Sequence, residues 1–498
     1  MTDIFDLYKP FRNAIRKLAL QPALKNCWNY QKRADVSGII RISTSLGDRS
    51  AIEFYVWELH ILCREILLHA NGDSDALSTL NGLVKYIHHI RDLTRSISER
   101  TINSGDSALK ALFPLAHQQV RWQYSLDEAR IFRTFYIYND PGLAEIFKRV
   151  TGTSISDMSA MSLTISGIAK NELVINTNQD YSAILTNKEA RDTFFKMTTK
   201  TINDIRNDIS EKQKYDESWA YTWNPLEAWP LINIDIRGNS EIWCPLPELL
   251  LRRVTEGVFY DLVDSGEKQF GDKFGRAFER YVGKVLSEIF NSEKYKVCGE
   301  QLYQVSGQTK HGVDWIVSDG SGNIFIECKA RRLTREAKEN SDGDAIKRAL
   351  ENLANAVVQL YRNIDDVISR RSGWCWNSLP IYPFVITYED WYLLTPHVVK
   401  YLLGCVCRKL GEHGLSPSII DENPFFVTSI AEFERAGQAI SHLGVKRFCT
   451  CADVNKHRYF KLSGLALAGF QGENIVYRRL FQESWGEMFP HLKRLLNN

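Results

Sequence analysis

The stretch HGVDWIVSDGSGNIFIECK, residues 311–329, contains two apolar runs that an Asp-Gly-Ser-Gly segment separates. Asp and Gly tolerate the backbone angles of a tight turn, so the stretch predicts a β-hairpin. Three charged residues, Asp314, Glu327 and Lys329, nevertheless lie within these runs. A carboxylate at the edge of a core is costly unless it is paired, hydrogen-bonded or bound to a metal. The stretch therefore predicts a β-hairpin in which these charged residues are paired, hydrogen-bonded or bound to a metal.

The alternation of a strand brings these three charges together. Glu327 and Lys329 are two residues apart and face the same side of their strand, while Ile326 and Cys328 face the other. If the two runs pair across the turn, Asp314 lies with them at the open end of the hairpin. Two carboxylates and a backbone carbonyl suit Mg²⁺, for which Mn²⁺ can substitute. A lysine beside them can hold an attacking water or stabilise charge that develops on phosphorus.

The flanking segments predict an α/β domain with a mixed sheet between helices. Apolar runs and helical periodicity, taken in chain order, give these elements: a helix at 274–290, strands at 294–305, 311–318 and 323–330, a helix at 344–368, a strand at 379–389, a helix at 397–413 and a strand near 424–430. The helix at 344–368 carries an apolar stripe and, beside it on the helix surface, a polar stripe that contains Asn352, Asn355 and Gln359.

The pattern Asp314…Glu327-x-Lys329 resembles that of the PD-(D/E)xK nuclease superfamily, whose fold many restriction endonucleases share. The residue before the aspartate, commonly Pro in the family, is Val313 here. The match is raised above chance by its context of apolar strands in a hairpin, with a helix on either side.

Two further positions are similar to the family's pattern. Many members carry a glutamate in a G-x-x-F-E context on the helix before the core strands, and Gly275, Phe278 and Glu279 match it. Members often carry a polar residue on the helix after the lysine, and Gln359 is the candidate.

The resemblance covers about residues 245–440 and implies a restriction-endonuclease-like fold and a Mg²⁺-dependent endonuclease that hydrolyses DNA phosphodiester bonds. It implies Asp314, Glu327 and Glu279 as metal ligands, with Lys329 and Gln359 as further catalytic residues. A large chain of this kind is similar in architecture to enzymes of bacterial restriction and anti-phage defence. The alternatives are a repair or recombination nuclease, and a nucleic-acid-binding or assembly subunit that does not cut. RNA as the substrate is not excluded.

A basic cluster follows the lysine and contains Arg331, Arg332 and Arg335. One interpretation is that these side chains bind substrate phosphates. The other is a solvated surface that neighbouring glutamates partly neutralise.

The remainder of the chain predicts a domain boundary between residues 240 and 241. Residues 1–240 are expected to form a mainly helical specificity, sensing or partner-docking domain, with helices at 51–70, 76–100 and 187–213. Residues 241–498 are expected to form the nuclease domain with C-terminal additions. A hairpin is expected at 232–244, turning at Gly238 and Asn239. The nearby tryptophans predict packing or, alternatively, a base-stacking platform: Trp219, Trp223, Trp229 and Trp243.

The bulk composition sets outer limits. Lys and Arg number 62 against 60 for Asp and Glu, a balance that neither indicates nor excludes nucleic acid. No apolar run approaches the length of a membrane span, and the first residues lack a signal-peptide pattern. The ten scattered cysteines are typical of a cytoplasmic protein with reduced thiols, a zinc or redox pair being the alternative. Since one site cuts one strand, double-strand cleavage favours a homodimer or sequential nicking. A partner protein docking on the N-terminal half is the other expectation.

Overall fold

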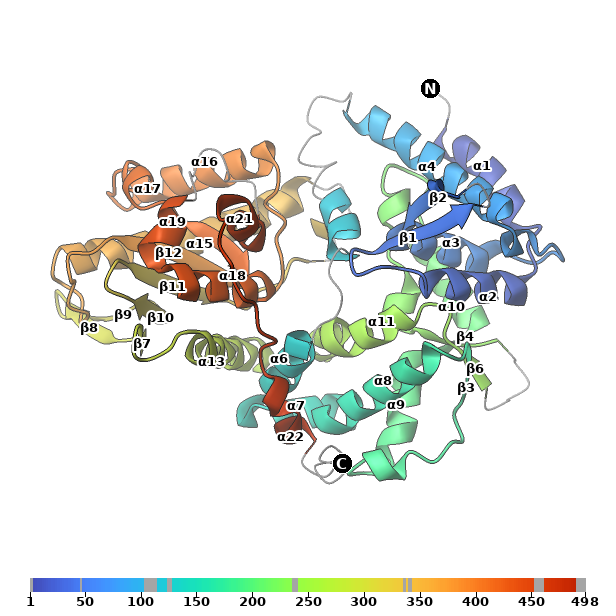
Figure 1. Cartoon of the computed structure of the whole chain (residues 1–498), viewed down its shortest axis with the longest axis horizontal. Helices are drawn as coiled ribbons and strands as arrows, with labels where there is room; N and C mark the ends of the chain where they lie inside the picture. The colour runs from blue at the N-terminus through green and yellow to red at the C-terminus, as the bar shows by residue number, and fades with distance from the viewer. Residues whose placement is uncertain are drawn as a thin grey trace. The chain divides into compact units, whose positions relative to one another are not determined.

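The computed structural model describes residues 3–44, 47–102, 114–122, 128–234, 241–334, 337–338, 343–451 and 461–489. The chain is a mixed α/β protein (Figure 1). It divides into two compact units: Met1–Phe270 with Lys338–Ser341 and Glu483–Asn498, and Gly271–Ala337 with Asp342–Gln482. None of the helices in the described ranges combines the length and the apolar character needed to cross a membrane.

The first unit is mainly helical and carries a two-stranded and a four-stranded sheet, β1-β2 and β3-β6-β5-β4. Its elements are α1 (Ile4–Ile15), α2 (Leu20–Gln31), β1 (Ile39–Thr44), β2 (Gly47–Tyr55), α3 (Val56–His69), η1 (Ala76–Ser78), α4 (Leu80–Ile102), η2 (Val120–Trp122), α6 (Glu128–Tyr138), α7 (Pro141–Thr151), α8 (Ile155–Ala169), β3 (Val174–Asn176), η3 (Ser182–Ile184), α9 (Ala190–Thr198), β4 (Thr199–Thr201), α10 (Ile202–Lys212), η4 (Trp219–Tyr221), η5 (Pro225–Glu227), β5 (Leu231–Asn233), β6 (Glu241–Trp243), α11 (Pro247–Arg252), η6 (Arg253–Gly257), α12 (Val258–Asp264) and α22 (Trp485–Met488).

The units divide at residue 270 rather than at the expected 240, because α11 and η6 are bound into the first unit. The buried Arg252 donates from Nη2 to the carbonyl oxygen of Arg121 at 3.0 Å. The buried Arg253 donates from Nε to the carbonyl oxygen of Ala228 at 2.7 Å. A buried guanidinium needs such partners, and residues 121 and 228 supply them.

Two of the helices expected in this unit are interrupted by strands. Residues 51–55 end β2, which pairs antiparallel with β1, and α3 begins only at Val56. The expected helix at 187–213 is broken by β4, the Thr-Lys-Thr segment that pairs parallel with β5. β-branched threonines favour the extended backbone, and a neighbouring strand supplied its hydrogen-bond partners.

The tryptophan cluster is core packing of the first unit. Trp219 is fully buried and meets Tyr8 and Phe11 at ring distances of 5.7 and 6.1 Å. Trp229 and Trp243 are partly buried against the same core. The packing interpretation is confirmed for these residues. The strands β5 and β6 of the expected hairpin do pair, whereas its turn at Gly238 and Asn239 lies outside the described residues.

The second unit is built on a five-stranded mixed sheet in the order β13-β12-β11-β10-β7. β10 pairs antiparallel with β7 on one side and with β11 on the other, while β11, β12 and β13 run parallel. Its elements are α13 (Phe270–Ile289), β7 (Lys296–Gly299), β8 (Leu302–Val305), β9 (Gln308–His311), β10 (Trp315–Ser318), β11 (Asn323–Lys329), α15 (Gly343–Ile368), β12 (Ile381–Thr387), α16 (Pro396–Glu412), α17 (Ile419–Glu422), β13 (Phe426–Ser429), α18 (Ile430–Leu443), α19 (Val445–Cys451), α21 (Leu462–Gly469) and η7 (Gln482–Ser484). The elements expected from residue 274 to residue 430 are present in the expected order, with one correction. The strand expected at 294–305 is two strands, β7 in the five-stranded sheet and β8, which pairs with the unexpected β9 in a sheet of its own. The short helix α17 was also not expected.

Helices cover both faces of this sheet (Figure 1). α15 packs on β11 and β12, with α16 against it. α13 lies on the opposite face, where Trp315 of β10 contacts it. α18 packs on β12 and β13 and is bonded to α13 through Tyr281 and Glu434. The apolar stripes expected on α13 and α15 are buried, for they supply these interfaces: Phe274, Phe278, Val282, Val285 and Ile289 on α13, and Ile346, Leu350, Leu353, Val357 and Ile364 on α15.

The β10-β11 hairpin turns where the sequence predicted. Ser318 pairs with Asn323, and the intervening turn is held by Asp319. Its carboxylate accepts hydrogen bonds from the backbone N–H groups of Ser321 and Gly322, at 2.7 and 3.0 Å, and from Val445 N at 2.8 Å. The hairpin is thereby tied to the start of α19.

A tryptophan fixes α13 against the sheet. Trp315, the first residue of β10, donates from Nε1 to the carbonyl oxygen of Glu279 at 3.1 Å. Its ring occupies the space beside Gly283, where a Cβ atom would lie only 2.3 Å from the ring. Gly275, the glycine of the G-x-x-F-E segment, has open space instead, with nothing within 4 Å of an added Cβ. The glycine that allows close packing is therefore Gly283.

Gly283→Ala should destabilise the protein by about 1–3 kcal/mol, the usual cost of overpacking, because the indole or the helix must move. Gly275→Ala on the same helix is the matched control. It should be neutral or stabilising by up to about 1 kcal/mol through helix propensity. Urea denaturation of both variants measures the difference, and equal effects would contradict the packing argument.

Candidate functional site

The register of the sheet aligns the two carboxylates of the predicted site. Trp315 pairs with Ile326, so Asp314 and Glu327 stand opposite each other one residue beyond that pair. The Asp314 carboxylate accepts a hydrogen bond from the backbone N–H of Cys328 at 2.6 Å. The strand geometry expected from the sequence thus brings Asp314 and Glu327 to one end of the hairpin.

Lys329 and Gln359 complete the group on the α15 side of the sheet. Lys329 Nζ lies 2.7 Å from Glu327 Oε1 and 3.4 Å from Gln359 Oε1. Glu327 and Lys329 share a strand face, and α15 places Gln359 over it. Four of the predicted catalytic residues therefore converge: Asp314, Glu327, Lys329 and Gln359.

Glu327 is a buried carboxylate that lacks sufficient partners. Its side chain is only 3% exposed, and its Oε2 atom has no hydrogen-bond partner among the described residues. Burial, followed by the negative charge of Asp314, raises the Glu327 pKa to about 8, against the opposing effect of Lys329. Burial also raises the pKa of Asp314. A site that penalises two negative charges in this way would be relieved by a cation.

Glu279 approaches this group from α13. It is half-buried at the edge of the helix's apolar stripe, as expected. Burial and then the charge of Asp314 raise its pKa. Its backbone carbonyl is fixed by Trp315, and no hydrogen bond links its carboxylate to the other site residues within the described part of the chain. Glu279 therefore lies near enough to Asp314 for the charge of Asp314 to raise its pKa.

A fourth carboxylate, Glu300, was missed in the sequence. Gly299 of β7 pairs with Trp315, so Glu300 stands opposite Asp314 one residue further on. Its charge raises the pKa of Glu279, Asp314 and Glu327, and its Oε1 lies 2.8 Å from His311 Nδ1. The sequence showed only that Glu300 follows an expected strand. It did not show how that strand pairs with β10, and this pairing places Glu300 beside Asp314.

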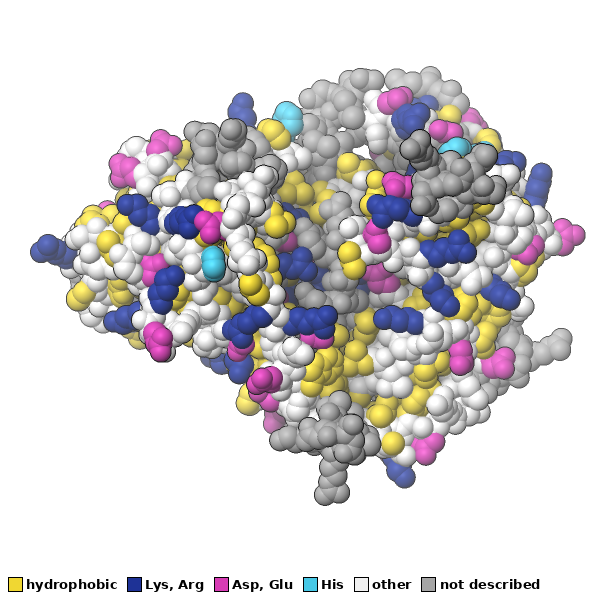
Figure 2. Space-filling view, in the orientation of Figure 1, with side chains coloured by type: hydrophobic (Ala, Val, Ile, Leu, Met, Phe, Trp, Pro, Cys, Tyr) yellow, Lys and Arg dark blue, Asp and Glu magenta, His cyan; other side chains and the backbone are white. Residues whose placement is uncertain are grey.

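The three arginines of the basic cluster differ in their surroundings. Arg331 is exposed, whereas Arg332 is nearly buried and pairs with Glu389 at 3.0 Å. Glu389 also accepts the backbone N–H of Leu333. Arg335 lies outside the described residues. Of the other two, only Arg331 is placed to meet a substrate in solution. On the face seen in Figure 2, Lys and Arg side chains are interspersed with Asp and Glu side chains.

Comparisons with known proteins identified no relative of this chain. A scan against protein-family models, a search of curated proteins and a search of solved structures each found no match to the chain. The resemblance therefore depends on the residues and their arrangement alone.

The donor set fits a hard divalent cation with few protein ligands. The described residues contain no group of three or more His, Cys, Asp or Glu side chains arranged to hold a metal. Mg²⁺ does not require one, because it keeps several waters and uses one or two carboxylates together with substrate phosphates. Asp314 and Glu327 meet that requirement, and the unpartnered Oε2 of Glu327 is an available ligand atom.

The cysteines of the described residues are free thiols. Cys405 and Cys449 are buried and Cys407 is half-buried, while Cys451 lies where side chains are not described. Among the described side chains, none of Cys405, Cys407 and Cys449 belongs to a group of three or more His, Cys, Asp or Glu that could hold a metal.

The raised pKa of Glu327 predicts how stability depends on pH in EDTA. The folded chain keeps a proton on Glu327 up to about pH 8, whereas the unfolded chain releases it near 4.5. The folded state therefore binds more protons in this window, and its stability falls as pH rises through it. Glu327→Gln should flatten this fall in urea denaturation measured at several pH values. The exposed control Glu293→Gln should keep the wild-type slope, and an unchanged slope in Glu327→Gln would contradict the assignment.

Proposed function

We propose that the chain is a Mg²⁺-dependent endonuclease that hydrolyses phosphodiester bonds, with DNA as its substrate. The observation that carries the proposal is the convergence of Asp314, Glu327, Lys329 and Gln359 at one end of the β10-β11 hairpin. Two facing carboxylates with an adjacent ammonium group match the requirements of phosphoryl transfer to water. The restriction-endonuclease-like fold belongs to the same proposal, supported by a mixed sheet with helices on both faces.

Asp314 and Glu327 would hold the cation, with Glu279 and Glu300 adding negative charge beside them. Bound there, Mg²⁺ would polarise the phosphate and lower the pKa of a coordinated water. Glu327 must lose its proton before it can act as a ligand, so cation binding releases a proton below about pH 8.

Lys329 supplies the positive charge that the chain itself contributes. Its Nζ donates to Glu327 and Gln359 and can donate to a water or to a phosphate oxygen at the same place. Gln359 orients the ammonium group. In the hydrolysis the water oxygen loses a proton and bonds to phosphorus. The bond from phosphorus to the leaving oxygen breaks, and the leaving oxygen takes up a proton from solvent.

The biological setting is proposed from architecture. The nuclease unit, Gly271–Ala337 with Asp342–Gln482, is accompanied by a mainly helical unit that is available for sensing, specificity or partner docking. This architecture supports restriction or anti-phage defence in the cytoplasm. Cutting both strands with one site per chain favours a homodimer.

Glu327→Gln should abolish cleavage, because the neutral amide cannot replace a carboxylate ligand. Purified wild-type protein should cut supercoiled DNA with Mg²⁺ and leave it intact with EDTA. Mg²⁺ should also raise the melting temperature of the wild type and not that of the variant. Glu422→Gln, an exposed substitution on α17, should match the wild type in both assays. A cutting Glu327→Gln variant would refute the metal assignment, and parallel reactions with single-stranded DNA and RNA identify the substrate.

Lys329→Met should slow turnover far more than it weakens cation binding. Loss of a preorganised charge donor costs about 2–4 kcal/mol in the barrier, or roughly a hundredfold to a thousandfold in kcat. Calorimetry should show Mg²⁺ affinity retained or increased, since a competing cation has gone. Lys296→Met, an exposed change at the opposite end of the sheet, is the control. Loss of Mg²⁺ binding together with activity would argue for a structural role of Lys329.

A further inference from the structure

A pocket lies beside the candidate nuclease site, at the carboxyl ends of β12 and β13. Its cavity volume is about 110 Å³, and it opens to solvent. A cavity of roughly 150 Å³ holds one benzene ring, so the pocket is of the size that takes a single planar ring. It includes Thr387, the strand partner of Lys329. Because paired strands lie about 4.8 Å apart, the pocket begins one strand away from the proposed catalytic lysine.

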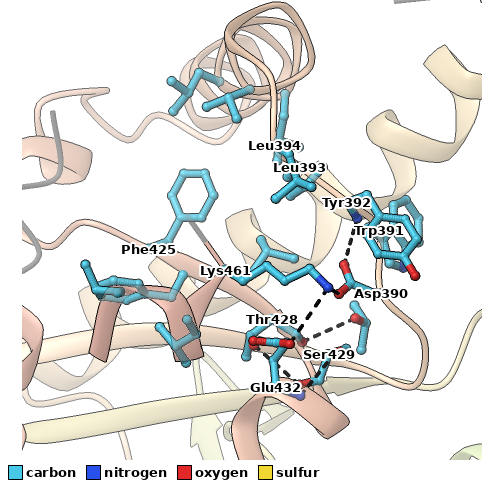
Figure 3. A pocket seen from close by; sticks show the side chains of 18 residues that line it. Asp390, Trp391, Tyr392, Leu393, Leu394, Phe425, Thr428, Ser429, Glu432 and Lys461 are labelled. Atoms are coloured by element: carbon cyan, nitrogen blue, oxygen red, sulfur yellow. Dashed lines mark hydrogen bonds and ion pairs between the residues drawn. The ribbon is translucent and has the colours of Figure 1, made fainter. Parts of the chain in front are cut away.

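The pocket has an aromatic and aliphatic upper part and a polar floor (Figure 3). Trp391, Tyr392, Leu393, Leu394 and Phe425 surround the upper part. Such walls hold flat, apolar faces of a ligand, since aromatic rings stack on one another and on planar heterocycles.

The floor carries charge in a fixed arrangement. Lys461 reaches toward Asp390, with Nζ 2.9 Å from Asp390 Oδ2 and 3.8 Å from Glu432 Oε1 (Figure 3). Of the described residues that line the pocket, these three are charged, so two carboxylates face one ammonium group and leave one negative charge among them. A phosphate is disfavoured there, and a ligand that donates hydrogen bonds is favoured.

An unpartnered donor lies in the same pocket. Trp391 is 5% exposed, and its Nε1–H has no hydrogen-bond partner among the described residues. A buried indole N–H normally has one, so an acceptor atom of a ligand in this pocket would complete the hydrogen bonding of Trp391. The neighbouring Tyr392 has a φ of 46°, which is strained for a bulky residue. Residues with strained backbone angles are concentrated at functional sites.

We propose that this pocket binds a nucleobase that carries an exocyclic amino group, namely adenine, cytosine or guanine. The amino group donates to the carboxylates of Asp390 and Glu432, and a ring nitrogen or carbonyl oxygen accepts from Trp391 or Lys461. The ring lies between the aromatic walls, as bases do when enzymes remove them from the stack. Uracil and thymine, which have a carbonyl oxygen in place of the amino group, fit the negative floor less well.

Two sources of such a base share this chemistry: a free nucleoside, and a base of the strand that meets Lys329. The segment Thr387–Tyr392 touches both sites, since Glu389 holds Arg332 and Leu333 while Asp390 and Trp391 line the pocket. Free-nucleoside binding would stand even if the chain cuts no nucleic acid. A base from the substrate strand rests on the proposed function.

Calorimetry in EDTA with adenosine, cytidine, guanosine and uridine tests the pocket without cleavage. The amino-bearing nucleosides should bind at least about tenfold tighter than uridine, a difference of about 1.4 kcal/mol. Short single-stranded oligonucleotides of adenine, cytosine or thymine form the second arm. Binding only in that arm, with adenine or cytosine preferred, identifies the strand as the source.

Two variants and a control make the result specific. Asp390→Asn removes the charge and keeps an oxygen for the backbone N–H of Tyr392, which Asp390 accepts at 2.8 Å. It should weaken binding about tenfold or more, and Leu403→Trp should abolish binding by filling the pocket. Asp421→Asn, exposed on α17, should change nothing. Uridine binding as tightly as adenosine, or binding that neither variant alters while both keep the wild-type melting temperature, would overturn the proposal. Nucleoside binding without Mg²⁺-dependent cleavage would instead refute the nuclease function alone.

Discussion

The pairing register of β10 with β11 is the constraint on which the candidate site depends. With Trp315 opposite Ile326, the next step brings Asp314 opposite Glu327. A slip of one residue would turn Glu327 and Lys329 to the α13 face and Ile326 to the α15 face. The turn bonded by Asp319 and the apolar contacts on both faces exclude that slip. The interactions that stabilise the hairpin in this register therefore also fix the geometry of the site.

The same sheet contains an unfavourable burial, that of the Glu327 carboxyl group, which packing elsewhere offsets. Glu327 is buried beside Asp314 with one oxygen unpartnered, which no stable core would favour by itself. The surrounding elements are well packed: Trp315 locks α13 beside Gly283, and α15 buries a complete apolar stripe. Rigid neighbours keep the two carboxyl groups close, and the proton that Glu327 retains up to about pH 8 relieves their repulsion.

Local patterns in the sequence predicted much of the second unit, and non-local contacts explain what they missed. Alternation and turn residues gave β10 and β11, and helical periodicity gave the buried faces of α13 and α15. Glu300 escaped because its place depends on how β7 pairs with β10, which no local pattern encodes. The packing role of Gly283 was missed because it depends on contact with Trp315, which is distant in the sequence. The break at β4 and the unit boundary followed likewise from distant partners, β5 for the strand and residues 121 and 228 for Arg252 and Arg253.

The cysteine inside the Glu-x-Lys motif has a consequence for covalent chemistry. Burial, with the charges of Asp314, Glu327 and Glu279, raises the pKa of the Cys328 thiol well above its ordinary value. Since only the thiolate attacks electrophiles or peroxide, Cys328 is protected from alkylation and oxidation by the same carboxylates that define the site. Cys375, by contrast, is exposed on the loop before β12. A maleimide fluorophore would therefore label Cys375 before Cys328 and report on the second unit while leaving the Glu-x-Lys strand unmodified.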